Sequence, residues 1–176
     1  MRHGAAPRKI RGFGSMKADE ASPPEPLPRV CALLNKHGAN YLIIGAQACI
    51  LHGMIRTTAD VDILVEENEE NYKRIIAALA ELPDGAAAEM TPADIADNVV
   101  VKIADEVEVD VSRRAWKVSY ADAKDTALQG EIDGVRIPYV SLEMLIASKG
   151  TYREQDRLDL LRLQEIIQMR KAENKR

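Results

Sequence analysis

The chain has 176 residues, of which 46% are hydrophobic and 30% charged, a balance typical of one globular domain. The formal net charge is −4, from 24 Lys and Arg against 28 Asp and Glu, which argues against bulk electrostatic capture of nucleic acid. No apolar run approaches the ~18 residues that cross a bilayer, which excludes an integral membrane protein. Cys31 and Cys49 lie in apolar, helix-like surroundings and are predicted to be buried free thiols in a reducing cytoplasm.

The first 26 residues differ in composition from the rest of the chain. They are rich in Gly, Pro, Ala and charge, and no apolar stretch follows the early basic residues, which argues against a secretory signal. Such a composition offers too little apolar surface to order itself alone. We expect residues 1–26 to be a flexible leader or a start-site extension, and residues 27–176 to form a single domain.

The first half of the domain alternates helical and extended patterns. Pro26 and Pro28 open a short helix that Gly38 ends, and the apolar run 41–44 predicts a buried strand. A short helix over 46–52 and a strand over 60–65 follow. The spacing of apolar residues predicts an amphipathic helix over 68–82.

The second half begins with strands and ends with helices. Residues 86–97 give no clear pattern, and two strands follow at 98–103 and 106–112, joined by a turn at Ala104-Asp105. A second hairpin is predicted across Asp133-Gly134. Ser141 is a good N-cap for a helix through Lys149. The last helix is predicted over 155–171, with these apolar residues facing inward: Leu158, Leu161, Ile166 and Met169. The class is α/β or α+β with a small mixed sheet.

Three carboxylates are candidates for chemistry. Asp60 and Asp62 are two apart at the start of a strand, so both side chains share one face, with Cα atoms about 6.5–7 Å apart. Converging carboxylates repel unless a cation lies between them, and divalent ions prefer such oxygens. Asp110 lies in an alternating strand that could bring it beside the pair. The alternative is that these are solvated residues at a sheet edge.

The sequence around the Asp pair resembles the core of the nucleotidyltransferase (DNA polymerase beta-like) superfamily. In that family a Gly-Gly or Gly-Ser turn between strand and helix is followed by Arg-x-Thr-x-Asp-x-Asp. Arg56, Thr58, Asp60 and Asp62 match the second part, and Asp110 matches the third carboxylate of a later strand.

The turn and the tail extend the resemblance over residues 40–163. The turn reads Gly45-Ala46-Gln47, without the second Gly or the Ser, and the Gln47 amide is a candidate substitute donor. The tail looks like that of small bacterial members, which include the toxins of abortive-infection toxin–antitoxin pairs. Its matching residues are Pro138, Ser141, Leu142, Glu143, Lys149, Arg153, Asp156 and Asp159.

The resemblance implies a nucleotidyltransferase fold: a small mixed, twisted sheet flanked by helices, with a short C-terminal helical part. It implies transfer of a nucleoside monophosphate from an NTP to a hydroxyl with release of pyrophosphate. Mg²⁺ or Mn²⁺ would be held by the catalytic carboxylates Asp60, Asp62 and Asp110. The nucleotide would be bound by Gly45, Ala46, Gln47, Arg56, Thr58, Lys149 and Arg153.

Other interpretations stay open at this point. The altered turn suits an inactive copy that serves as a binding or regulatory module, with an antitoxin as a candidate partner. The acceptor of an active enzyme would be a tRNA end, a protein or a small molecule. Asp156 and Asp159 could hold Lys149 or Arg153 in place, or they could form a plain surface salt-bridge ladder. Trp116 and Tyr120 are expected to pack a small hydrophobic lid rather than to stack a base.

Overall fold

The computed structural model describes residues 25–150 and 153–174, so the predicted leader up to residue 24 lies outside the described residues. The helices are α1 (Pro26–Lys36), α2 (Gly45–Leu51), α3 (Glu69–Leu79), α4 (Pro92–Ala96), α5 (Tyr120–Ala123), the short 3₁₀ helix η1 (Lys124–Thr126), α6 (Leu142–Ser148) and α7 (Glu154–Glu173). The strands are β1 (Tyr41–Ile43), β2 (Val61–Val65), β3 (Val100–Ala104), β4 (Glu108–Ser112), β5 (Arg114–Ala115), β6 (Val118–Ser119), β7 (Leu128–Ile132) and β8 (Val135–Tyr139). Among the described residues, no helix combines the length and the apolar character that a membrane crossing requires.

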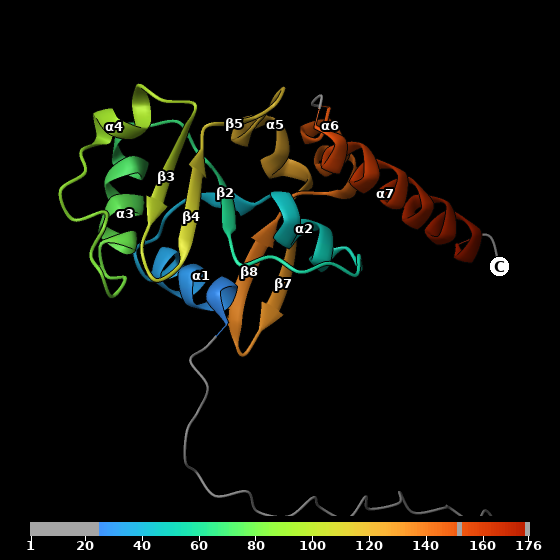
Figure 1. Ribbon diagram of the computed structural model, residues 1–176, viewed down its shortest axis with the longest axis horizontal. Helices are drawn as coiled ribbons and strands as arrows, with labels where there is room; N and C mark the ends of the chain where they lie inside the picture. Colours follow the sequence, from blue (N-terminus) through green and yellow to red (C-terminus); the bar gives the residue numbers. More distant parts are fainter. Residues whose placement is uncertain (1–24, 151–152, 175–176) are drawn as a thin grey trace, which may run out of the picture.

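A six-stranded mixed sheet forms the centre of the fold, in the order β3-β4-β2-β1-β8-β7 (Figure 1). The two central strands β2 and β1 are antiparallel, and each has a parallel neighbour on its other side, β4 and β8 respectively. The outer strands β3 and β7 are antiparallel partners in hairpins. The predicted mixed α/β sheet is therefore confirmed.

Helices pack against the sheet around one hydrophobic core. Helix α1 packs on β8 and α3, and α2 packs on β2 and α6. Figure 1 shows α3 and α4 near β3 and β4, while α7 extends away from the body at the other end of the molecule. The core includes these fully buried side chains: Val30, Leu34, Ile43, Ile63, Leu64, Ile75, Leu79, Ile137, Leu145 and Leu163.

Several local signals in the sequence are confirmed. Gly38 follows α1 with φ +64°, the left-handed conformation that ends a helix. Ser141 caps α6 by accepting a hydrogen bond from the Met144 backbone N–H. Asp133 and Gly134 form the two-residue turn between β7 and β8, both with positive φ. Cys31 and Cys49 are buried free thiols.

The turn between β3 and β4 differs from the predicted one. The last paired residues are Ala104 and Glu108, so the turn spans 105–107 instead of 104–105. The Asp105 carboxylate explains the longer turn, because it accepts hydrogen bonds from the backbone N–H groups of Asp84, Ala86 and Glu106. The register therefore places Lys102 opposite Asp110.

The inward face of α7 was predicted wrongly. Leu158, Leu161 and Met169 are 48%, 60% and 65% exposed, and the buried residues of this helix are Asp159 and Leu163. The physical reason is that a buried ion pair at Asp159 fixes the rotation of the helix. Ile166, which was also predicted to face inward, packs partly buried against the core.

Candidate active site

Two carboxylates lie side by side on neighbouring parallel strands. Asp62 of β2 and Asp110 of β4 are register partners. The residues that flank each of them in sequence are fully buried: Val61 and Ile63 in β2, Val109 and Val111 in β4. Because successive side chains alternate between the two faces of a sheet, both carboxylates project from the face opposite to these valines and isoleucine. The neighbouring strand thus brings Asp110 beside Asp62, one member of the Asp pair, whereas Asp60 precedes β2.

The start of α2 is packed directly against Asp62. Gly45 has φ +64°, and a Cβ atom built there would lie 2.3 Å from Asp62 Oδ2 and 2.8 Å from its Cγ. The backbone N–H of Ile44 also donates to the Asp62 carbonyl oxygen at 3.0 Å. Glycine is therefore required at position 45 both by the backbone conformation and by the space that the carboxylate occupies.

These groups open into a cleft of about 690 Å³. Five of the ten predicted site residues line it: Gly45, Asp62, Asp110, Lys149 and Arg153. The cleft is also lined by Ile44, Val100, Ser112, Arg114, Ala115, Trp116, Ser148 and Asp156. Acidic and basic side chains thus face the same space, an arrangement that suits a phosphorylated ligand together with a cation. The prediction that Lys149 lies at the Asp cleft is confirmed.

The other five predicted site residues lie outside the lining of this cleft. Ala46 and Gln47 are buried within α2, and the Gln47 Nε2 group donates to the Asp60 carbonyl oxygen at 3.4 Å. Asp60 is the residue immediately before β2, and Arg56 and Thr58 belong to the loop between α2 and β2. The Gln47 amide, the candidate substitute donor at the turn, is thus directed at the backbone of the Asp60 loop.

Burial and like charge perturb Asp62. Burial raises the pKa of Asp62 from 3.8 to about 6, with further increases from the negative charges of Asp110 and Asp60. Lys149 and Lys102 oppose the increase. Burial is thus the larger cause of the raised pKa, and the negative charges of the neighbouring carboxylates add to it, as expected for carboxylates gathered without a cation. Asp60 is thus close enough to act electrostatically even though it does not line the cleft.

Asp110 has an unsatisfied oxygen. Its Oδ1 atom is buried and has no hydrogen-bond partner among the described residues, although the Lys102 Nζ atom lies 3.4 Å away as an ion pair. Lys102 also pairs with Glu108 on the same strand as Asp110. A buried carboxylate oxygen that lacks a hydrogen bond is costly, which marks Asp110 as a position prepared for a ligand or a cation.

The carboxylates fit a cation only in part. Within the part of the chain that the structure describes, no three His, Cys, Asp or Glu side chains are arranged to hold a metal ion by themselves. The predicted set of Asp60, Asp62 and Asp110 is thus not a ready three-ligand site. Mg²⁺ in nucleotide sites is usually bound by one or two carboxylates together with substrate phosphates and water. Asp62 and Asp110 meet that requirement.

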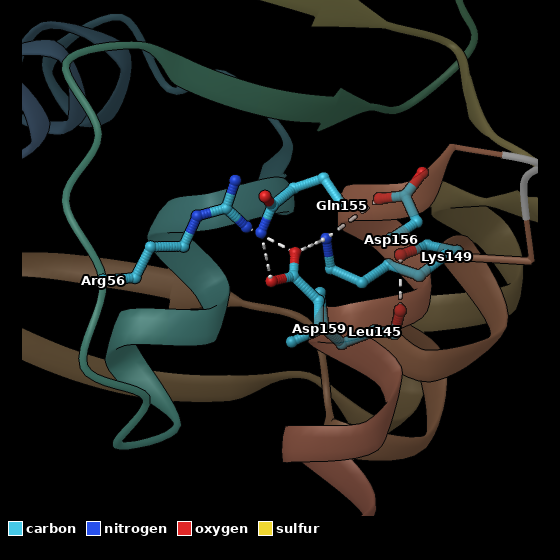
Figure 2. A network of polar contacts seen from close by, with 7 residues as sticks. Arg56, Leu145, Lys149, Gln155, Asp156 and Asp159 are labelled. Atoms are coloured by element: carbon cyan, nitrogen blue, oxygen red, sulfur yellow. Dashed lines mark hydrogen bonds and ion pairs between the residues drawn. The ribbon is translucent and has the colours of Figure 1, made fainter.

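Lys149 is held at the cleft by a buried polar network (Figure 2). Its Nζ atom lies 2.7 Å from Asp159 Oδ2 and 3.3 Å from Asp156 Oδ1. The Asp159 side chain is completely buried, and Gln155 Nε2 donates to its other oxygen at 3.1 Å. Burial alone would raise the pKa of Asp159, but Lys149, Gln155 and Arg56 together hold that pKa below its usual value. For Asp159, the interpretation as a surface salt-bridge ladder is therefore wrong.

Arg56 belongs to the same network. Its guanidinium forms an ion pair with Asp159, 103 residues further along the chain. Figure 2 shows Arg56 approaching Asp159 from the side opposite to Lys149. Arg56 therefore connects the loop before β2 to the start of α7, and its charge is engaged by a carboxylate.

Lys102, Arg114 and Trp116 are neighbours of the site outside the predicted set; Arg114 had been expected at a solvated strand end, with contact to a polyanionic substrate as the alternative. The longer β3–β4 turn sets the register that places Lys102 opposite Asp110, and the predicted turn at 104–105 does not give this register. Arg114 and Trp116 lie on the short β5–β6 hairpin, for which the sequence shows no pattern. Trp116 is 46% exposed, so it does not pack into a closed lid, whereas Tyr120 is partly buried against the core.

Comparisons with known proteins bear on the fold. The sequence matches no protein-family profile and no curated protein. The structure is similar to an antigenic nucleotidyltransferase-like protein from Paracoccidioides brasiliensis, with a TM-score of 0.51 and 18% identity over 78% of this chain and 72% of that one. It is also similar to a protein from Thermotoga maritima provisionally assigned as a nucleotidyltransferase, with a TM-score of 0.46 and 20% identity over 85% of this chain and 91% of that one. The sheet, its flanking helices and the likeness at a TM-score of 0.51 agree with the expected architecture: the chain has the nucleotidyltransferase fold.

Proposed function

We propose that the protein is a metal-dependent nucleotidyltransferase that moves a nucleoside monophosphate from an NTP to a hydroxyl acceptor. The observation that carries the proposal is the side-by-side placement of Asp62 and Asp110 in a cleft that also holds Lys149 and Arg153. Carboxylates supply cation ligands and basic side chains supply phosphate contacts, so a single cleft provides both requirements of phosphoryl chemistry.

In the proposed reaction the acceptor oxygen attacks the α-phosphorus, and the bond from that phosphorus to the bridging oxygen of the β-phosphate breaks. Pyrophosphate leaves with the bonding electrons. Asp110 Oδ1, which has no hydrogen bond among the described residues, accepts the proton of the acceptor hydroxyl. Lys149 and Arg153 neutralise charge on the phosphates. Bound Mg²⁺ or Mn²⁺, held by Asp62 and Asp110 with Asp60 nearby, would stabilise the charge on the attacking and leaving oxygens.

The test is transfer from α-labelled NTPs into RNA, protein and small-molecule pools, with Mg²⁺ or Mn²⁺ present and pyrophosphate measured in parallel. These pools include the three acceptor classes of the proposal: a tRNA end, a protein and a small molecule. We expect Asp62→Asn and Asp110→Asn to abolish both signals. Asp133→Asn, in the β7–β8 turn where Asn tolerates the positive φ, is the matched control and keeps them. Equal pyrophosphate release by wild type and Asp62→Asn would refute the proposal.

A second candidate is a module that binds nucleotide without transferring it, for example beside an antitoxin partner. The specific observation in its favour is the start of α2, where Ala46 and Gln47 are buried and the Gln47 amide contacts the Asp60 carbonyl oxygen. Calorimetric NTP binding without pyrophosphate release would favour this module.

The buried free thiols of Cys31 and Cys49 suit a reducing compartment, and we place either activity in the cytoplasm.

A further inference from the structure

We propose that the indole ring of Trp116 is the stacking platform for the nucleobase of the ligand. The inference rests on the proposed function, because it takes the cleft with Asp62 and Asp110 as the nucleotide site. It adds a recognition element that the carboxylates and basic residues cannot supply, since these act on the phosphates and a cation. The ligand is therefore expected to be a complete nucleotide, whose base stacks with its flat face on the indole ring.

The first argument is position and exposure. Trp116 lines the same cleft as Asp62 and Asp110. Among the described residues that line this cleft, it is the only aromatic one. Nearly half of its surface, 46%, is exposed. A half-exposed indole beside charged groups offers an aromatic surface that a planar ligand can cover.

The second argument is how the ring is held. Trp116 begins the turn of the β5–β6 hairpin, whose strands pair Arg114 with Ser119 and Ala115 with Val118. Its φ of +56° is a left-handed conformation that bulky residues seldom adopt. Such strain persists where the surrounding structure maintains it, and it concentrates at ligand sites. The buried Val118 anchors the hairpin to the core.

The third argument is the contact with the end of α6. A Cβ atom at Gly150 would lie 2.8 Å from the indole Nε1 and 3.0 Å from Cδ1. The pyrrole edge of the ring is therefore packed against Gly150, next to the phosphate-binding candidate Lys149. The ring thus meets Gly150 along one edge at the boundary of the cleft, and 46% of the residue's surface is accessible to a ligand.

Stacking also predicts weak discrimination between the four bases. Base–aromatic stacking tolerates all bases, because every base has a π-face, and it contributes enough that its loss weakens binding by about tenfold or more. We therefore expect all four NTPs to bind within about tenfold of one another, with the larger purines bound more tightly.

The experiment uses a property of the sequence: Trp116 is the one tryptophan of the chain, so all tryptophan emission reports this residue. Wild-type protein is titrated with ATP, with tripolyphosphate and with adenosine, each in the presence of Mg²⁺. We expect ATP to quench the emission strongly, adenosine to quench it at higher concentration, and tripolyphosphate to bind with a much smaller change.

Calorimetry on variants separates the base from the phosphates. Trp116→Asn removes the ring while keeping a residue that tolerates positive φ, and Trp116→Phe keeps an aromatic face. We expect Trp116→Asn to weaken ATP binding about tenfold and to leave tripolyphosphate binding unchanged. Trp116→Phe should stay within about threefold of wild type. Gly150→Ala, which displaces the ring without removing it, should weaken ATP binding but not tripolyphosphate binding. Thermal melts establish that each variant is folded.

The outcomes separate the inference from the proposed function. If ATP binds equally to wild type and Trp116→Asn with no change in emission, the stacking platform is wrong and the proposed function stands. If ATP binds through Trp116 but wild type releases no pyrophosphate, the proposed transfer is wrong and the platform stands. Absence of binding by both ATP and tripolyphosphate would overturn both.

Discussion

Replacing Asp159 by Asn removes the negative charge at the centre of the polar network while keeping the size of the side chain. Asp159 is completely buried and accepts from Lys149, Gln155 and Arg56. The Lys149 side chain is only 7% exposed. In the Asn variant, the Lys149 ammonium keeps the more distant Asp156 at 3.3 Å, and the Arg56 guanidinium loses its buried carboxylate.

Removing one partner from a buried ion pair costs about 3–5 kcal/mol, because an uncompensated charge is left in the interior. For a domain of this size that loss lowers Tm by roughly 6–20 °C. Asp156→Asn is the matched control, since its carboxylate is further from Lys149 and 17% exposed. We expect that variant to lose about 1 kcal/mol.

The assay is urea unfolding of the three proteins, repeated across pH. The pKa of Asp159 is held below its usual 3.8, so the charge contributes stability that is present above pH 3.8 and is lost as the pH falls through the lowered value. The difference between wild type and Asp159→Asn should therefore stay constant from pH 8 to about pH 5 and shrink only in more acidic solution. A loss below about 1 kcal/mol, or equal losses for the two variants, would refute the argument that this network is buried and coupled.

Four further predictions concern the cleft and the leader. The pKa of Asp62 is raised from 3.8 to about 6, so the folded state pays a penalty for the charged carboxylate that grows from about pH 4 and is complete above pH 6. Asp62→Asn should therefore stabilise the ligand-free protein at pH 8 by up to about 3 kcal/mol, with no gain left by about pH 4. Mn²⁺ or Mg²⁺ should stabilise wild type by about 2.7 kcal/mol at a hundredfold excess over Kd, but not this variant; a melt that metal does not shift, even with each NTP present, would contradict the proposed role of Asp62. Gly45→Ala should impair NTP binding, because the added methyl would meet the Asp62 carboxylate. Gly38→Ala is the control: it has the same φ of +64° but nothing within 4 Å of the added methyl, so it should lower stability in urea unfolding and leave NTP binding unchanged. Equal NTP binding by the two variants would contradict the contact with Asp62. A protein that begins at residue 25 should melt within a few degrees of the full chain, and a drop of tens of degrees would show that the leader packs on the domain.

Most of the element order was predictable because local signals determine it, whereas α4, the β5–β6 hairpin and α5 were not predicted. The capping Ser141 and the Asp133-Gly134 turn acted as the sequence indicated, since both depend on contacts within a few residues. The β3–β4 turn was predicted one residue too short and shifted, because its length is set by Asp105 contacts that reach back to Asp84 and Ala86. Such contacts between distant segments leave no local pattern in the sequence.

In the candidate site, too, the features set by local pattern were predicted and those set by contacts between distant segments were missed. Asp62 and Asp110 were found from strand alternation together with the family resemblance, and their pairing follows from the parallel register. Arg56 was expected at the nucleotide, yet it pairs with Asp159, a residue that was placed on a charged helix face. Helical periodicity treats a charged residue as outward-facing and cannot anticipate two cations that meet it in the interior. The rotation of α7, and with it the exposure of Leu158 and Leu161, was mispredicted for that reason.

The pairing of β1 with β8 has a consequence for how the chain is synthesised. Ile43 finds its parallel partner at Tyr139, and α1 rests its apolar side on the same late strand. At about 5–20 residues per second, the roughly one hundred residues between them take on the order of 5–20 seconds to leave the ribosome. During that interval one edge of β1 and the side of α1 that packs on β8 stay uncovered. The nascent chain therefore exposes an unpaired strand edge and apolar helix surface that chaperones can bind, and a ribosome stalled before β8 leaves β1 as an open edge strand.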